Sequence, residues 1–187
     1  MVLLTPFLAR LPAMPTAADL DAAIRDVPDF PKPGILFKDI TPILGDPELF
    51  RASLELLAET AGDTKIDKVV GIDARGFIFA AGVAHILGAG FVPVRKKGKL
   101  PWITHQMAYS LEYGEDVVEI HADAVKPGEK ILLIDDLLAT GGTAAAAIKL
   151  LKEIDAEIVG VSFLIELAAL NGRDVLGHSG IQSLLSF

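Results

Sequence analysis

The sequence contains no cysteine, so disulfide bonds and thiolate metal sites are excluded. A chain of this kind suits a reducing compartment, and we expect a cytoplasmic protein. Basic residues are also scarce, because 17 Lys and Arg face 25 Asp and Glu, for a net charge of −8. Proteins that bind nucleic acid need a basic surface to neutralise phosphates, so this balance argues against a nucleic-acid partner. The four histidines show no metal-ligand spacing, and we expect no metal held directly by the chain.

The sequence also lacks an uninterrupted apolar segment suited to a membrane helix, although 51% of its residues are hydrophobic. The longest candidate, residues 76–94, contains four glycines and a proline, which favour a helix, a turn and a short strand. No membrane partner is therefore expected. Residues 1–18 form an apolar leader that lacks a basic start and is interrupted by Pro6, Pro12 and Pro15, so a secretory signal is poorly supported. We expect this leader to be loosely ordered or packed against a partner.

Segments with strand character alternate with helical segments along the rest of the chain. The expected strands are residues 66–72, 91–94, 117–121, 131–134 and 158–165, and helices are expected at 77–87 and after residue 143 to about residue 154. Another helix should begin at Asp46-Pro47-Glu48, with Asp46 as its N-cap, and end near Gly62. This alternation predicts an α/β fold, in which a mostly parallel twisted sheet is flanked by helices. In such sheets, ligands bind beyond the carboxyl ends of the strands.

The most informative stretch is ILLIDDLLATGGT, residues 131–143, which lies where one of these strands should end. Its Thr140-Gly141-Gly142-Thr143 segment precedes an alanine-rich helix. Glycines allow several backbone N–H groups to converge, and the threonine hydroxyls and the helix N-terminus add to the attraction for an anion. Because no Gly-Lys-Ser/Thr sequence occurs, this is not a nucleoside triphosphate loop. The pattern predicts a cup for a phosphate monoester.

Two neighbouring carboxylates, Asp135 and Asp136, come a few residues before this cup. Since it is costly to bury two like charges side by side, a ligand that needs both would explain the pair. They suit two vicinal ribose hydroxyls and positive charge at the anomeric carbon of the sugar. The alternative is a solvated Asp-Asp loop start without a ligand. The order of carboxylates and glycine cup favours the sugar-binding interpretation.

Residues 135–143 resemble the signature for 5-phosphoribosyl 1-pyrophosphate (PRPP) of the type I phosphoribosyltransferases, in the form typical of the adenine-using branch. The supporting stretches are FPKPGILFKDITP at 30–42, GIDARGFIF at 71–79, and RKKGKLP and YSLEYG within 95–114. The likeness runs from about residue 25 to residue 187. It implies one domain over residues 19–187, with an N-terminal hood at about 25–42 and a flexible lid loop at about 95–110. It also implies a homodimer.

The resemblance assigns roles to residues of this sequence. Binding of the 5-phosphate and ribose falls to Asp135, Asp136, Ala139, Thr140, Gly141, Gly142 and Thr143. Binding of pyrophosphate falls to Asp73, Ala74, Arg75, Arg95, Lys96, Lys99 and Tyr113, with a cis peptide expected between Asp73 and Ala74. Adenine would stack on Phe37 and be read by backbone groups of Leu36 and Lys38. The implied catalytic residues are Glu112, as a proton carrier for the purine, with Arg75, Asp135 and Asp136.

The implied reaction forms AMP and pyrophosphate from adenine and PRPP, with Mg²⁺ carried by PRPP. The basic residues of segment 95–99 would close over the pyrophosphate and exclude water. Three alternatives stay open at this point: a phosphoribosyltransferase for hypoxanthine, guanine or xanthine, a PRPP-sensing regulator that binds nucleic acid, and a catalytically silent binding domain. The acidic charge balance disfavours the regulator, and Glu112 together with the basic segment weighs against the silent domain.

Overall fold

The computed structural model describes residues 14–111 and 114–187. The chain divides into two compact units, Met1–Ala52 and Ser53–Phe187. The N-terminal unit contains helix α1 (Ala17–Ala23), the antiparallel strands β1 (Arg25–Pro28) and β2 (Leu36–Asp39), helix α2 (Thr41–Gly45), and the first turns of helix α3 (Pro47–Glu59). The predicted start of α3 is confirmed, because a side-chain oxygen of Asp46 accepts hydrogen bonds from the N–H groups of Glu48 (2.9 Å) and Leu49 (3.0 Å).

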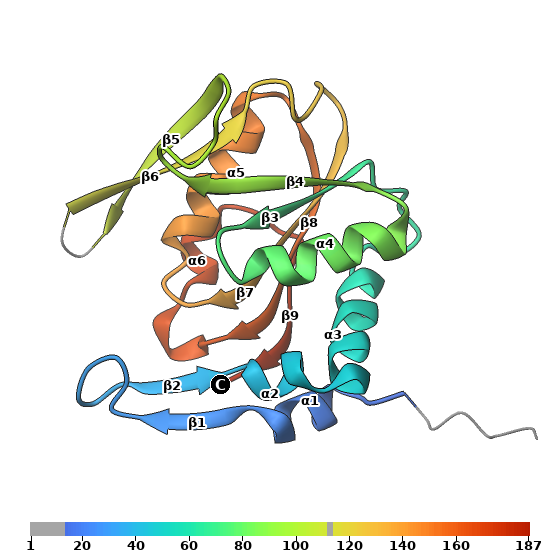
Figure 1. Cartoon of the computed structure of the whole chain (residues 1–187). Helices are drawn as coiled ribbons and strands as arrows, with labels where there is room; N and C mark the ends of the chain where they lie inside the picture. The colour runs from blue at the N-terminus through green and yellow to red at the C-terminus, as the bar shows by residue number, and fades with distance from the viewer. Residues whose placement is uncertain (1–13, 112–113) are drawn as a thin grey trace, which may run out of the picture. The chain divides into compact units, whose positions relative to one another are not determined.

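The C-terminal unit is built on a seven-stranded sheet, shown in Figure 1. Its strands are β3 (Lys68–Ile72), β4 (Gly90–Lys96), β5 (Thr104–Leu111), β6 (Gly114–His121), β7 (Lys130–Leu138), β8 (Glu157–Glu166) and β9 (Ile181–Ser186), in the order β5-β6-β4-β3-β7-β8-β9. The β4-β3-β7-β8-β9 part is parallel, whereas β6 pairs antiparallel with both β4 and β5. The predicted α/β fold with a mostly parallel sheet is therefore confirmed.

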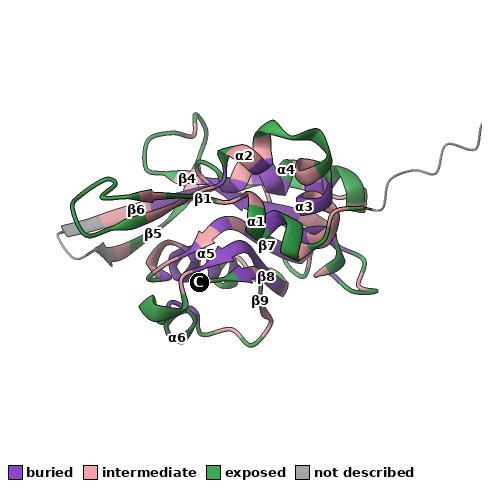
Figure 2. Cartoon of the chain, turned by 90° about the horizontal axis from the view of Figure 1, so that it is seen from below, coloured by how far each residue is buried: buried purple, intermediate pink, exposed green. Residues whose placement is uncertain are grey.

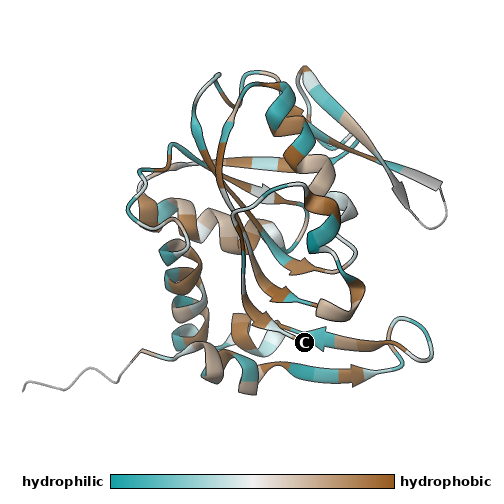
Figure 3. Ribbon diagram, turned by 180° about the vertical axis from the view of Figure 1, so that it is seen from behind, coloured by the Kyte–Doolittle hydropathy of each residue, from teal (hydrophilic) through white to brown (hydrophobic). Residues whose placement is uncertain are grey.

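Helices cover the faces of this sheet. Helix α4 (Gly76–Leu87) packs against β3 and β7, while α5 (Gly142–Glu153) packs against β8 and the β5–β6 pair, with α6 (Arg173–Leu176) beside it. A short 3₁₀ turn, η1 (Ala168–Leu170), leads from β8 towards α6. The middle strands are buried on both faces, which explains their continuous apolar sequences. Figure 2 shows these buried layers, and Figure 3 shows the matching hydrophobic colouring of the central strands.

Two elements differ from the expectation drawn from the sequence. Strand β7 does not end before the two aspartates but continues to Leu138, because it stays paired with β8 as far as Glu166. The segment expected to be a long loop contains β5, which pairs with β6 along its whole length and leaves only residues 97–103 as the connection from β4. In the part of the chain that the structure describes, no helix is long and apolar enough to cross a membrane.

Candidate active site

A cavity of about 350 Å³ lies at the carboxyl ends of β3, β4 and β7, as expected for a sheet of this kind. Charged residues from four different segments of the chain meet in it. Its lining consists of Ile72, Asp73, Ala74, Arg75, Val94, Arg95, Lys96, Tyr109, Asp116, Val118, Asp135, Asp136 and Thr143. The cavity therefore brings together the aspartate pair and most of the residues predicted to bind pyrophosphate.

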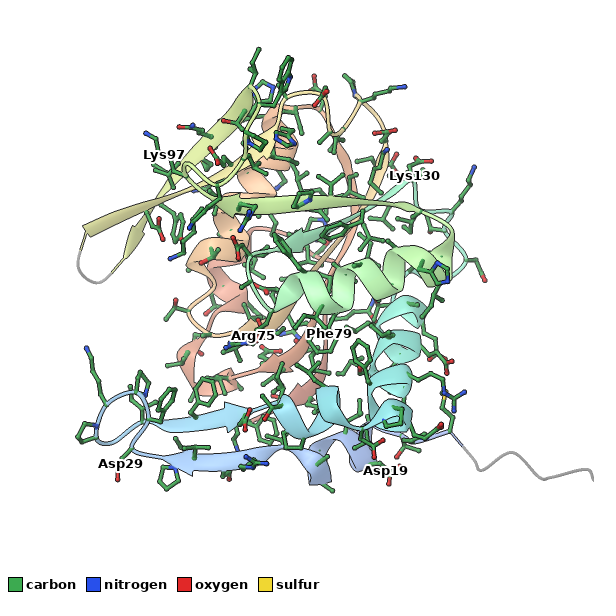
Figure 4. All side chains as sticks on the ribbon, in the orientation of Figure 1. Asp19, Asp29, Arg75, Phe79, Lys97 and Lys130 are labelled. Atoms are coloured by element: carbon green, nitrogen blue, oxygen red, sulfur yellow. The ribbon has the colours of Figure 1, made fainter. Side chains whose placement is uncertain are left out.

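The turn from β3 into α4 packs directly against the aspartate pair. Arg75, labelled in Figure 4, donates a hydrogen bond from Nε to Oδ2 of Asp136, whose exposed fraction is only 8%. At the next residue, Gly76, a β-carbon would lie 2.5 Å from Oδ1 of Asp135. Glycine is therefore required at the start of α4 because the Asp135 carboxylate occupies the space that a side chain would need.

The two neighbouring aspartates have different environments. Burial raises the pKa of Asp135 well above its ordinary value, and the nearby charge of Asp136 raises it further. The Asp135 carboxylate accepts one backbone hydrogen bond, from the N–H of Asp136 at 2.9 Å. Asp136 instead has the Arg75 guanidinium as its ion-pair partner. The site thus contains one carboxylate that is paired with a cation, Asp136, and one that is costly to ionise, Asp135.

The other cations of the cavity are also paired with acids. Arg95 donates from Nε to Oδ2 of Asp73 at 2.9 Å, and Nζ of Lys96 lies 2.9 Å from Oδ2 of Asp116. The peptide bond between Asp73 and Ala74 is cis, as the sequence resemblance implied. An anionic ligand that enters here can replace these carboxylates as the ion-pair partner of Arg95 and Lys96. The arrangement therefore suits a polyanion such as pyrophosphate.

A smaller cavity of about 90 Å³ adjoins the first one and is formed by the predicted phosphate cup. Its lining residues are Asp135, Leu137, Leu138, Ala139, Thr140, Gly141, Gly142, Thr143 and Ala144. Gly141 has the left-handed backbone angle φ +81° and precedes α5, where no side chain caps the helix. The N–H groups of the first turn of α5 are thus available to an anion. Asp135 and Thr143 line both cavities, so the two lie side by side.

The N-terminal unit has an apolar cavity of its own. It has a volume of about 260 Å³ and is lined by Val27, Phe30, Phe37 and Asp39. The rings of Phe30 and Phe37 meet edge to face, with their centroids 5.2 Å apart. Of the three residues predicted to bind adenine, Phe37 lines this cavity, and Leu36 and Lys38 flank it on β2. A flat aromatic ligand fits such a surface.

Comparison with known proteins identifies the family. The phosphoribosyl transferase domain family matches residues 40–175. The adenine phosphoribosyltransferase of Agrobacterium fabrum is 57% identical over 165 residues, which cover 88% of this chain and 92% of the relative. The chain belongs to the adenine phosphoribosyltransferase family. 

Solved structures of this family share the fold. The adenine phosphoribosyltransferase of Rhodothermus marinus superposes with a TM-score of 0.87 at 53% identity, covering 91% of this chain and 98% of that one. The Saccharomyces cerevisiae member, in complex with adenine and an imino-altritol bisphosphate, gives a TM-score of 0.85 at 42% identity, with 90% and 98% coverage.

Two polar residues of the larger cavity, Tyr109 and Asp116, received no role from the sequence of this adenine phosphoribosyltransferase family member. The Tyr109 hydroxyl accepts a hydrogen bond from Oγ1 of Thr143 (3.3 Å) and donates one to Oδ2 of Asp116 (3.2 Å), which also pairs with Lys96. Burial raises the pKa of the Tyr109 phenol. These bonds link the phosphate cup to the β5–β6 pair. In the sequence, Tyr109 stands in the stretch YSLEYG, and Asp116 directly precedes the expected strand 117–121. Which side chains of β5 and β6 face the cavity depends on how the two strands pair.

Three residues predicted to act at the site are not placed in it. Lys99 is exposed and does not line the cavity, and its backbone N–H bonds to Oε1 of Glu119 at 3.0 Å. Glu112 and Tyr113 lie outside the described residues. Their roles stay predictions.

Proposed function

We propose that this protein transfers a phosphoribosyl group to adenine, forming AMP and pyrophosphate from adenine and PRPP in purine salvage. The observation that carries the proposal is the junction of the two cavities at Asp135 and Thr143. A glycine cup for a phosphate thereby lies next to two carboxylates, and these lie next to paired cations. The family relationship supports the same reading, and the yeast relative was solved with adenine bound.

PRPP would occupy the two cavities along its length. Its 5-phosphate would enter the cup of residues 139–143, where the N-terminus of α5 favours an anion by about 0.3–1 kcal/mol. The ribose hydroxyls would donate hydrogen bonds to Asp135 and Asp136. Pyrophosphate would take Arg75, Arg95 and Lys96 from their carboxylate partners, with the backbone of Asp73 and Ala74 beside them.

In the reaction the bond from the anomeric carbon to pyrophosphate breaks, and pyrophosphate leaves with the electron pair. Adenine N9 forms the new bond to that carbon, and adenine loses one proton. The sugar is cationic between these events, so carboxylates held close to it lower the barrier. Asp135 and Asp136 would supply that stabilisation, and Arg75 would stabilise the leaving group.

Mg²⁺ is expected to arrive with PRPP, bound by pyrophosphate and ribose oxygens, and to neutralise the departing pyrophosphate. The residues fit this ion, because Asp73, Asp116 and Asp135 present hard carboxylate oxygens to the cavity. Among residues 14–111 and 114–187, no group of three metal-ligating side chains occurs. We expect the ion to be held largely by substrate oxygens and water.

Adenine would stack on Phe37, with the backbone of Leu36 and Lys38 reading its edge. The apolar lining around Phe37 supports this, and Lys38 is held in place on β2 by an ion pair of 2.7 Å with Asp26.

Glu112 would exchange a proton with the purine, a contribution typically worth about 10²–10⁴-fold in rate. The sequence resemblance is its support. The same resemblance predicts that segment 95–110 closes over pyrophosphate and that the protein is a homodimer. A cytoplasmic location is predicted from the absence of cysteine.

The test is a competition among bases. The purified protein is supplied with PRPP, Mg²⁺ and equal amounts of adenine, hypoxanthine and guanine, and the nucleotides are separated by chromatography. We expect AMP as the main product, with pyrophosphate released only when a base is present. Asp136→Asn should lower kcat/KM by about 10²–10³-fold. IMP or GMP as the main product would move the assignment to another purine, and turnover close to that of wild type in the variant would contradict the role given to Asp136.

A further inference from the structure

The segment after β8, from η1 to α6, packs against the back of the phosphate cup. Backbone bonds hold the start of this segment: the N–H of Leu167 donates to the carbonyl of Leu138 at the end of β7 (2.9 Å), and the N–H of Ala168 donates to the carbonyl of Phe187 (2.8 Å). The segment then turns at Asn171, with φ +52°, and reaches Gly172. Nothing in the sequence of the cup indicates this contact, since some 30 residues separate the two.

Gly172 and the cup are interlocked through glycine. A β-carbon on Gly172 would lie 2.2 Å from the carbonyl oxygen of Ala139 and 2.9 Å from Cδ1 of Leu138. In the other direction, a β-carbon on Gly141 would lie 2.4 Å from the carbonyl oxygen of Gly172. Both glycines are buried. Each backbone therefore occupies the space where the other would carry a side chain.

Gly172 is needed for space and not for its backbone conformation. Its angles, φ −59° and ψ −28°, are those of a right-handed helix, which every residue adopts readily. Gly177, at the other end of α6, is the opposite case: it has φ +58°, and nothing lies within 4 Å of its missing β-carbon. A change at Gly172 thus presses on the cup, whereas a change at Gly177 strains only its own backbone.

The Gly172 turn is anchored, so it cannot easily move away from the cup. Arg173 donates from Nε and Nη2 to the carboxylate of Glu166, with the shortest distances at 2.7 Å, and from Nη1 to the carbonyl of Ile181 at 3.0 Å. Glu166 is only 7% exposed and also accepts a bond from Ser183 Oγ at 2.8 Å. This forked pair lowers the pKa of Glu166 and ties the turn to β8 and β9.

We propose that Gly172, anchored through Arg173 and Glu166, is a positioning residue that sets the shape of the phosphate cup for the 5-phosphate of the sugar. It contacts the loop that holds the ligand, at Ala139 and Gly141, and lines neither the larger cavity nor the cup itself. The inference rests on the proposed function only in assuming that the cup receives a ribose 5-phosphate. Its effect should therefore fall on sugar-phosphate binding and leave adenine binding unchanged.

The experiment titrates ribose 5-phosphate into the wild type, Gly172→Ala, Gly177→Ala and Arg173→Lys by calorimetry, and melts each protein. In Gly172→Ala, we expect affinity for ribose 5-phosphate to fall about 10–100-fold, since a misplacement near 1 Å has effects of that size. The kcat/KM for PRPP should fall in parallel, with the KM for adenine within twofold of wild type. Gly177→Ala should lower the Tm by a few degrees and bind ribose 5-phosphate like the wild type.

Arg173→Lys keeps the positive charge but cannot form the bidentate hydrogen bonds to Glu166, so its affinity for ribose 5-phosphate should be about 3–10-fold lower than that of the wild type. If Gly172→Ala does not fold, this second variant is the test of the inference. The inference would be overturned if a folded Gly172→Ala protein bound ribose 5-phosphate with unchanged affinity. If Gly172→Ala does not fold, unchanged affinity in Arg173→Lys would overturn it. An equal loss of affinity in Gly177→Ala would also overturn it, because ordinary destabilisation would then be the cause. The titration contains no adenine or other purine, so its result does not depend on catalysis. A wild type that binds ribose 5-phosphate but fails to make AMP would contradict the proposed function and not this inference.

Discussion

Replacing Asp135 by asparagine should make the protein more stable near neutral pH and at the same time less active. The carboxylate accepts one hydrogen bond, from the N–H of Asp136, and the asparagine carbonyl can keep that bond. What the substitution removes is a charge that burial and the neighbouring Asp136 both disfavour. Asp135 is half-buried, and leaving a group of this kind poorly compensated costs about 1–3 kcal/mol. For a chain of this size, the gain corresponds to an increase in Tm of about 3–10 °C.

The pH dependence identifies the cause. The unfolded chain ionises Asp135 near its ordinary pKa of 3.8, whereas the folded protein ionises it only at a higher pH. Between these two values the folded state retains a proton that the unfolded state has lost, so the wild type loses stability as pH rises through that window. Asparagine does not titrate. The difference in Tm should therefore be close to zero near pH 4 and largest above the folded pKa.

The assay is thermal melting of the wild type and Asp135→Asn from pH 4 to pH 8, with kcat/KM measured at pH 7.5. Activity should fall about 10²-fold or more, because the substitution removes the carboxylate that we propose to stabilise the cationic sugar. Asp116→Asn is the control of opposite sign: the hydrogen bond from Lys96 holds the pKa of Asp116 below its ordinary value, so this substitution should lower the Tm slightly at neutral pH. The reasoning would be refuted if Asp135→Asn had no higher Tm than the wild type at pH 8. It would also be refuted if the difference in Tm were as large at pH 4 as at pH 8.

Three further predictions concern single contacts. Gly76→Ala pushes a methyl group against the Asp135 carboxylate and should lower kcat/KM about 10–100-fold. Gly82→Ala, on the same helix, meets only the side chain of Leu54, away from the cavity, and should keep near-native kcat/KM. Tyr109→Phe removes the hydroxyl between the cup and the β5–β6 pair and should raise the KM for PRPP about 3–10-fold; an unchanged KM would contradict a role in binding. Phe37→Ala should raise the KM for adenine about tenfold with little change in the KM for PRPP, measured by varying one substrate at a time.

The parts of the site that lie within one short stretch were predictable from the sequence. The cup, the aspartate pair and the turn at Asp73-Ala74-Arg75 each combine residues that are adjacent in the chain, at strand-to-helix junctions that hydrophobic periodicity locates. Even here, the extent of β7 was not predicted. The strand continues through the charged pair because β8 offers it hydrogen-bonding partners, and local propensity does not contain that information.

By itself, the sequence determined the alternation of strands and helices, and therefore a mostly parallel sheet with its candidate site at the carboxyl ends of β3 and β7. It also determined the glycine cup with its two carboxylates, because these depend on neighbouring residues and on backbone conformations that only glycine adopts easily. Tertiary structure alone decided which distant groups meet. Tyr109 reaches Thr143 through strand register, Lys96 pairs with Asp116, and Gly172 fills the space behind Gly141. Such contacts arise from packing between segments far apart in the chain, where a separation of tenths of an ångström decides which residue fits.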